Sequence, residues 1–144
     1  MPTTAIRQTP FLRTALLGDA AASGATGLLL VIAASPLAPM LGLPEPLLRV
    51  AGLLLLPYAG FVGWVGTRAA PSRGTVRGIV LVNLLWAADS ALLLILGPAL
   101  AGLAPTALGI AFVLAQALAV LGFAVAQWIA LRRAGSSGGA PALA

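Results

Sequence analysis

The stretch GIVLVNLLWAADSALLLILG, residues 78–97, decides the class of fold, because it is long, apolar and almost free of charge. A helix that crosses the hydrocarbon core of a bilayer needs about 20 mostly apolar residues. The stretch has that length, and its neighbouring leucines lack the alternation that a barrel strand would show. It therefore predicts a transmembrane helix.

Three further stretches have the same character, at residues 14–34, 47–67 and 106–131. Backbone groups in lipid must be hydrogen-bonded internally, so each stretch is expected to be helical. The whole chain agrees, since 60% of its 144 residues are hydrophobic and 8% are charged, against about 25% charged in soluble domains. We expect an all-α polytopic protein whose surroundings are the lipid bilayer.

The connections between these spans are short, which makes consecutive spans antiparallel neighbours. Residues 35–46 hold four prolines and predict a rigid, non-helical link. The spans then form two tandem hairpins in a four-helix bundle. The expected divisions are an N-terminal cytoplasmic segment 1–13, a first hairpin 14–67, a cytoplasmic loop 68–77, a second hairpin 78–131 and a disordered cytoplasmic tail 132–144.

Arginine placement predicts the orientation, because cytoplasmic loops of membrane proteins carry an excess of basic residues. Seven arginines fall on one side of the predicted membrane, and only Arg49 falls on the other; the seven are Arg7, Arg13, Arg68, Arg73, Arg77, Arg132 and Arg133. Both termini are therefore expected to be cytoplasmic, in the inner (plasma) membrane of a bacterium. A cleaved signal peptide is the weaker alternative, because the first apolar run is long and contains Asp19.

The two halves of the chain resemble each other at an offset of 64 residues. Arg13 then aligns with Arg77, Asp19 with Asn83, Trp64 with Trp128 and Arg68 with Arg132. Tryptophan and arginine are common at any membrane interface, so convergence is the alternative explanation. A true duplication would relate the hairpins by a pseudo-twofold axis along the membrane normal.

The composition excludes several kinds of chemistry. The chain has no cysteine, histidine or lysine, and its carboxylates are Asp19, Glu45 and Asp89. Thiol nucleophiles, thiolate metal sites and histidine bases are thus absent. We expect no cofactor, no metal and no enzymatic activity. The net charge of +5 lies in arginines at the ends of apolar runs, so we expect no nucleic-acid partner.

Asp89 is the most informative residue, because a carboxylate inside a membrane span costs about 2.5–3.5 kcal/mol on insertion scales. We expect it to face the bundle interior or a water-filled cavity, with Gln116 as its first hydrogen-bond partner and Ser90 as its second. Such a site would bind a proton or cation. The alternative is a hydrogen bond that only holds helices together.

Asp19 and Asn83 form a second candidate polar pair, which would face across the pseudo-twofold axis. The favoured interpretation of Asp19 is instead an interfacial carboxylate within reach of arginines at the helix ends. Trp64, Trp128, Arg68 and Arg132 are expected to anchor the chain at the interface. Small residues predict close helix packing, a dimer face or a pore lining, at Gly24, Gly27, Gly60, Gly63 and Gly66.

Two functions remain after these exclusions. The first is a non-enzymatic accessory, assembly or scaffold subunit of a membrane complex, with other membrane subunits or a second copy as partners. The second is a small transporter or channel, either a monomer or a dimer, that uses Asp89 for proton or cation coupling. A lipid-modifying enzyme is the weakest option, because no nucleophile lies beside a base.

Overall fold

The computed structural model describes residues 5–136, and this part of the chain is helical, with one isolated bridge between Ala5 and Ser72. The helices are α1 (Pro10–Ile32), α2 (Ala34–Leu41), α3 (Glu45–Gly66), α4 (Arg73–Ala101) and α5 (Ala107–Ser136). All except α2 are long and apolar enough to cross a membrane. The predicted all-α, multi-pass architecture is confirmed.

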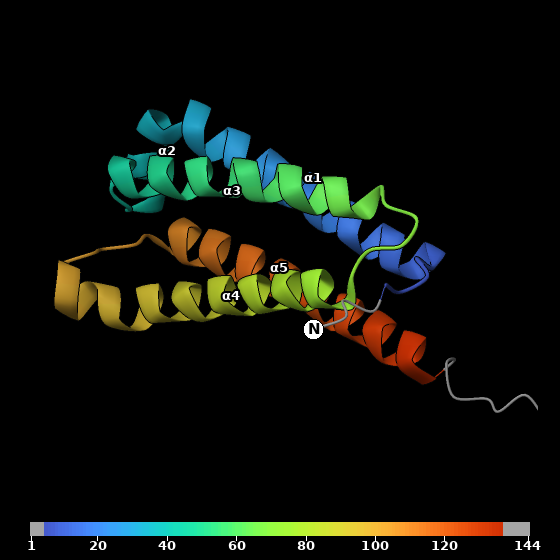
Figure 1. Ribbon diagram of the computed structural model, residues 1–144. Coiled ribbons are helices and arrows are strands. Elements are labelled where there is room, and N and C mark those ends of the chain that lie inside the picture. Colours follow the sequence, from blue (N-terminus) through green and yellow to red (C-terminus); the bar gives the residue numbers. More distant parts are fainter. Residues whose placement is uncertain (1–4, 137–144) are drawn as a thin grey trace, which may run out of the picture.

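The four long helices form two hairpins, one above the other in Figure 1. Helix α1 packs along α3, and α4 packs along α5, while the contact between the hairpins is made chiefly by α1 and α5. Helices α3 and α4 make little direct contact. The bundle is therefore closed on its α1–α5 side and looser on its α3–α4 side.

Local sequence signals set the helix ends. The hydroxyls of Thr9 and Ser72 accept hydrogen bonds from the backbone of Leu12 and Thr75 at 3.2 and 3.0 Å, which caps the first turns of α1 and α4. Helices α2 and α4 end at Gly42 and Gly102, whose φ angles are 64° and 61°. Glycine is suited to this left-handed conformation because it lacks a Cβ.

Helix boundaries differ from the expected ones on the second hairpin. Because Ser72 caps it, α4 begins at Arg73, which shortens the loop predicted over residues 68–77. Helix α5 continues to Ser136, so residues 132–136 belong to a helix and not to a disordered tail. The remainder of that predicted tail, residues 137–144, lies outside the described residues.

The prediction that residues 35–46 are non-helical is wrong, because α2 covers residues 35–41 and α3 begins at Glu45. Pro36 falls in the first turn of α2, where a backbone N–H has no intrahelical partner to lose. Pro39 removes one hydrogen bond from this short helix. Burial of Ala34 and Leu41, both at most 2% exposed, offsets that loss.

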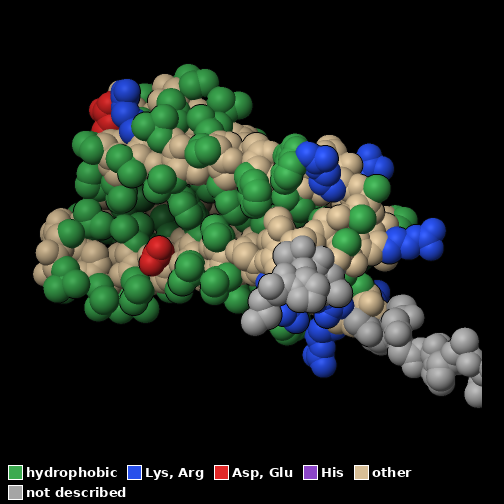
Figure 2. Space-filling model, in the orientation of Figure 1, with side chains coloured by type: hydrophobic (Ala, Val, Ile, Leu, Met, Phe, Trp, Pro, Cys, Tyr) green, Lys and Arg blue, Asp and Glu red, His purple; other side chains and the backbone are tan. Residues whose placement is uncertain are grey.

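Two apolar clusters form the interior, one toward each end of the bundle. The cluster toward the end where most arginines lie includes Leu12, Leu16, Val62, Val65, Val76, Ile79 and Leu131. The cluster toward the opposite end includes Leu30, Leu41, Leu48, Leu55 and Val113. Large apolar side chains also cover the outer surface, and Figure 2 shows arginines gathered at one end of it. This pattern is that of a protein solvated by lipid.

Within the first hairpin, α1 and α3 approach each other closely at Gly27 and Gly52. A Cβ at Gly52 would lie 2.7 Å from the carbonyl oxygen of Gly27 and 2.8 Å from Cγ2 of Val31. We expect Gly52→Ala to destabilise the protein by about 1–3 kcal/mol, as overpacked sites do. The measurement is the free energy of unfolding in mixed micelles with increasing SDS.

Gly60 in the same helix is the matched control, because a Cβ there would meet nothing within 4 Å. Gly60→Ala should leave stability unchanged or raise it by up to about 1 kcal/mol through helix propensity. Equal losses at both positions would contradict a close approach of the two helices at Gly52.

Candidate functional site

A cluster of polar side chains lies in the interior around Asp19. Asp19 and Gln127 are each 0% exposed, Asn83 is 1% exposed and Ser23 is 5% exposed. Every spanning helix contributes, with Asp19 and Ser23 on α1, Tyr58 on α3, Asn83 on α4 and Gln127 on α5. The cluster therefore joins the two hairpins. We call these five residues the Asp19 cluster.

Asp19 is the acceptor at the centre of the cluster. Its Oδ2 accepts from Asn83 Nδ2 at 2.7 Å and from Gln127 Nε2 at 2.9 Å. Its Oδ1 accepts from the Ser23 hydroxyl at 3.1 Å. All of these donors are neutral, so they solvate the carboxylate without supplying a counter-charge.

Tyr58 extends the cluster across the gap between α3 and α4. Its hydroxyl lies 2.8 Å from Asn83 Oδ1 and 3.3 Å from Asp19 Oδ2. A hydroxyl carries one proton, so the shorter contact is its better donor bond. Asn83 thus accepts from Tyr58 and donates to Asp19, which links three helices in one chain of hydrogen bonds.

The interpretation of Asp19 as an interfacial carboxylate near arginines is wrong. Asp19 lies about 14 Å along α1 from Pro10, given a rise of ~1.5 Å per residue, and it is fully buried. No ion pair joins it to an arginine within residues 5–136. The alternative pairing with Asn83, its counterpart at the 64-residue offset, is the arrangement that the structure contains.

Sequence reasoning assigned no role to Tyr58 or Gln127. Gln127 stands nine residues before the end of α5, and Asp19 stands nine residues after the start of α1. In antiparallel helices that place them at similar depth, two polar residues in apolar runs are potential partners. The matching depth of Gln127 and Asp19 could therefore have been recognised from the sequence. It was missed because Gln127 is adjacent to Trp128, which was assigned to the membrane interface.

Asp89 does not join the Asp19 cluster and does not face the bundle interior as expected. It is exposed on α4, and within the described residues it has no hydrogen-bond or ion-pair partner. The predicted bond to Gln116 is not present. The Ser90 hydroxyl donates instead to the carbonyl of Trp86 in its own helix, at 2.8 Å.

Helical periodicity explains this position. The buried stripe of α4 includes Asn83, Ala87 and Ser90, which recur at the three- and four-residue spacing of one helix face. Asp89 precedes Ser90 by one residue, and therefore points about 100° away from the stripe. Its side chain reaches the edge of the bundle rather than its centre.

Asp89 lines an apolar groove of about 210 Å³ between the hairpins, toward the end opposite the arginines. Ser90 and Gln116 also line it, together with leucines of α3 and Phe112 of α5. Figure 2 shows a hollow between the two hairpins with hydrophobic side chains at its edges. We call this hollow the Asp89 groove.

Two further cavities lie between the Asp89 groove and the Asp19 cluster. One of about 40 Å³ is lined by Gln116, Trp86 and Ser23. Another of about 220 Å³ is lined by Ser23, Tyr58, Asn83 and Trp86. Trp86 borders all three spaces, so it separates the groove from the cluster.

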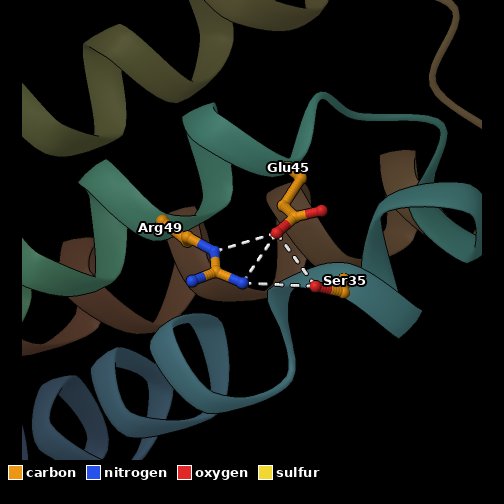
Figure 3. Close-up of polar contacts among 3 residues, drawn as sticks. All are labelled: Ser35, Glu45 and Arg49. Atoms are coloured by element: carbon orange, nitrogen blue, oxygen red, sulfur yellow. Dashed lines mark hydrogen bonds and ion pairs between the residues drawn. The ribbon is translucent and has the colours of Figure 1, made fainter.

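The other carboxylate, Glu45, belongs to an exposed network at the start of α3 (Figure 3). Its Oε1 lies 2.7 Å from a terminal nitrogen of Arg49 and accepts from the Ser35 hydroxyl at 2.9 Å. Arg49 also donates to Ser35 at 3.2 Å. The network connects α2 to α3, and because its ion pair is exposed to solvent it contributes little to stability.

The predicted interface residues lie near the arginine-rich end. Trp64 and Trp128 are 52% and 46% exposed, as anchors at a membrane interface would be. The Arg68 guanidinium lies 4.1 Å from the centre of the Trp64 ring. Arg132 is exposed at the end of α5.

The predicted packing glycines fall into two groups. A Cβ at Gly24, Gly27, Gly63 or Gly66 would come within 3.6 Å of the opposite helix of the first hairpin. Gly60 has no such neighbour, so it is not a packing position. The spacing of three residues explains the difference, since it turns successive glycines progressively around a helix of 3.6 residues per turn.

A comparison of the chain with protein families, with curated proteins and with solved structures finds no match. Within residues 5–136 there is no group of three or more His, Cys, Asp or Glu side chains that could hold a metal ion. The structure offers two separate features, the buried Asp19 cluster and the open Asp89 groove.

Proposed function

We propose that this chain is a non-enzymatic accessory subunit of a membrane complex, and that the Asp89 groove binds a transmembrane helix of another subunit. The observation that carries the proposal is an unpartnered carboxylate at the edge of an apolar groove. A charged side chain within a membrane-spanning helix normally pairs with another group. A partner helix that carries an arginine or lysine at this level would supply the missing charge.

The groove is suited to a helix because its walls are apolar and its side is open. Helices α3 and α4 make little direct contact there, and Leu54, which lines the groove, is 59% exposed. A partner helix would fill the space by dispersion contacts, which drive association in lipid. The charge pair with Asp89 would then fix its depth and register.

A second copy of the chain fits this groove less well than a different protein. Arg49 is the one arginine placed toward the Asp89 end, and it is engaged by Glu45 and Ser35. The other seven belong to the opposite ends of the helices, as the sequence places them. A copy in the same orientation therefore brings no free cation to the level of Asp89.

The arrangement of the remaining polar groups supports a role without catalysis. Asp19 is enclosed by hydrogen bonds, and Glu45 is held by Arg49. The Ser90 hydroxyl is bonded to a carbonyl of its own helix, and within residues 5–136 it makes no hydrogen bond to a carboxylate. A nucleophile requires an adjacent activating group, and this pattern does not provide one.

We further propose that the chain lies in the inner membrane of a bacterium with both termini in the cytoplasm. The seven-to-one distribution of arginines supports this orientation. The direct contact between Asp19 and Asn83, residues separated by 64 positions, supports an origin of the hairpins by duplication. Such a pair would face across the pseudo-twofold axis.

A proton- or cation-coupled transporter or channel is the second candidate. The observation that favours it is the succession of cavities from the Asp89 groove, past Trp86, to the Asp19 cluster. In that case Asp89 would be the first binding position for an ion that passes from the groove to the Asp19 cluster. The two candidates differ in what Asp89 contacts, which is a partner helix in one and a permeating ion in the other.

We expect Asp89→Leu to abolish partner binding while leaving the fold intact, because Asp89 makes no hydrogen bond within residues 5–136. The full chain would carry a photo-crosslinking residue at Leu54 in the groove, and complexes from native membranes would be measured by native mass spectrometry. Crosslinking should require Asp89 and should capture a helix with a basic residue. Thermal stability of Asp89→Leu should equal or exceed that of the native chain.

A crosslinker at Leu118, which is 67% exposed and lies outside the groove, is the matched control. Equal capture at Leu54 and Leu118 would contradict a specific groove partner. A partner-free protein that conducts ions in liposomes, and loses the flux in Asp89→Asn, would replace the accessory role with the transporter.

A further inference from the structure

We propose that the Asp19 cluster is a binding site for one small monovalent cation of the Na⁺ class. The inference is independent of the function proposed for the groove, because it rests on different residues. Its starting point is the charge of Asp19, which is 0% exposed and surrounded by neutral side chains. A buried carboxylate without a counter-charge carries a large desolvation penalty that neutral donors offset only in part.

A second observation points to a ligand. The Oε1 atom of Gln127 is buried and has no hydrogen-bond partner in the described structure. It belongs to the same amide whose nitrogen donates to Asp19. An orphaned acceptor calls for a donor or a cation, and a cation would satisfy this oxygen and the carboxylate of Asp19 together.

The cluster contains the oxygens that a small hard cation requires. Besides the Asp19 carboxylate they are the amide oxygens of Asn83 and Gln127 and the hydroxyls of Ser23 and Tyr58. Either amide can present its oxygen after a half turn of its end group, because both ends have nearly the same shape. Hard cations select ligand sets of this all-oxygen kind.

The charge of the cluster selects a monovalent ion. Asp19 is its single carboxylate, and within residues 5–136 no second acidic side chain joins it. One positive charge would therefore neutralise the site, whereas a divalent ion would leave a buried excess charge. The ion also has an approach, since Ser23, Tyr58 and Asn83 line the cavity of about 220 Å³ on the loose α3–α4 side. That volume is several times larger than the roughly 30 Å³ that one water molecule occupies in the liquid.

An ion held by side chains from α1, α3, α4 and α5 would lock the hairpins together. Binding to the folded state alone raises stability in proportion to the logarithm of ligand concentration above Kd. We therefore expect the Tm of the purified full-length protein in micelles to rise with NaCl. N-methyl-D-glucamine chloride would replace NaCl at constant ionic strength, so that only the size of the cation changes.

The matched variants are Asp19→Asn and Asp89→Asn. The rise in Tm with Na⁺ should disappear in Asp19→Asn and persist in Asp89→Asn, and a direct ²²Na⁺ binding measurement should give one ion per native chain. If Asp19→Asn does not fold, Gln127→Leu provides the test, because it removes the orphaned oxygen and keeps the carboxylate. Its affinity for Na⁺ should fall by about tenfold or more, as for loss of a group that supports a bound metal.

A Tm that is independent of Na⁺ in the native chain would overturn the proposal. The same Tm in NaCl and in N-methyl-D-glucamine chloride would be that result, and it would leave Asp19 held by its neutral donors alone. Retention of the full Na⁺ response in both Asp19→Asn and Gln127→Leu would place the ion elsewhere. None of these results would affect partner capture at the Asp89 groove, so the two proposals can fail separately.

Discussion

Asn83→Leu is expected to destabilise the protein by about 3 kcal/mol, because it leaves a buried carboxylate short of a donor. Asn83 supplies the shortest hydrogen bond to Asp19, at 2.7 Å, and accepts from Tyr58 at 2.8 Å. Leucine has a similar volume, so the loss reflects polarity rather than a cavity. SDS-induced unfolding without Na⁺ would measure it.

Ser90→Ala is the control on the same helix face. The Ser90 hydroxyl is bonded within its own helix, so this change should cost less than about 1 kcal/mol. Asp19→Asn introduced into the Asn83→Leu background removes the charge and should restore part of the lost stability. Losses that simply add would show that Asp19 and Asn83 do not interact in the folded protein.

The membrane architecture could be predicted from sequence because it depends on properties that are averaged over whole segments. The stretch 78–97 is apolar over a length that matches the bilayer, and this holds wherever its ends fall. The ends themselves depend on single residues. Ser72 extends α4 by capping it at Arg73, and burial of Leu41 overrides the prolines around it to form α2.

The polar sites were harder to predict because they depend on the rotation of each helix. Asp89 and Ser90 are adjacent in sequence, yet one is exposed and the other buried. Both the buried and the exposed faces of α4 carry large apolar side chains. These side chains do not mark the face that turns inward, so Asp89 was expected in the interior. The pairing of Asp19 with Asn83 was accessible as an alternative because the two residues align at the 64-residue offset between the halves of the chain.

The largest effect of a single methyl group is expected at Gly109, where α5 begins against the end of α2. A Cβ on this residue would collide with the carbonyl oxygen of Leu41 and would lie 2.9 Å from its carbonyl carbon. That carbonyl also accepts the backbone N–H of Thr106 at 3.0 Å, while the Thr106 hydroxyl donates to Met40 at 2.7 Å. The colliding atoms of Leu41 belong to its backbone, so a change of side-chain rotamer cannot relieve the clash.

Gly109→Ala should therefore destabilise the protein by about 3 kcal/mol, at the upper end of the range for overpacked sites. It should also displace the first turns of α5, where Phe112 and Val113 line the Asp89 groove. Gly122→Ala in the same helix is the control, because a Cβ there meets nothing within 4 Å. Crosslinking from Leu54 would report the groove, and unfolding in SDS would report stability. If Gly109→Ala matched Gly122→Ala in both measurements, α2 would not be held against α5, and the end of the groove would have to be formed by other contacts.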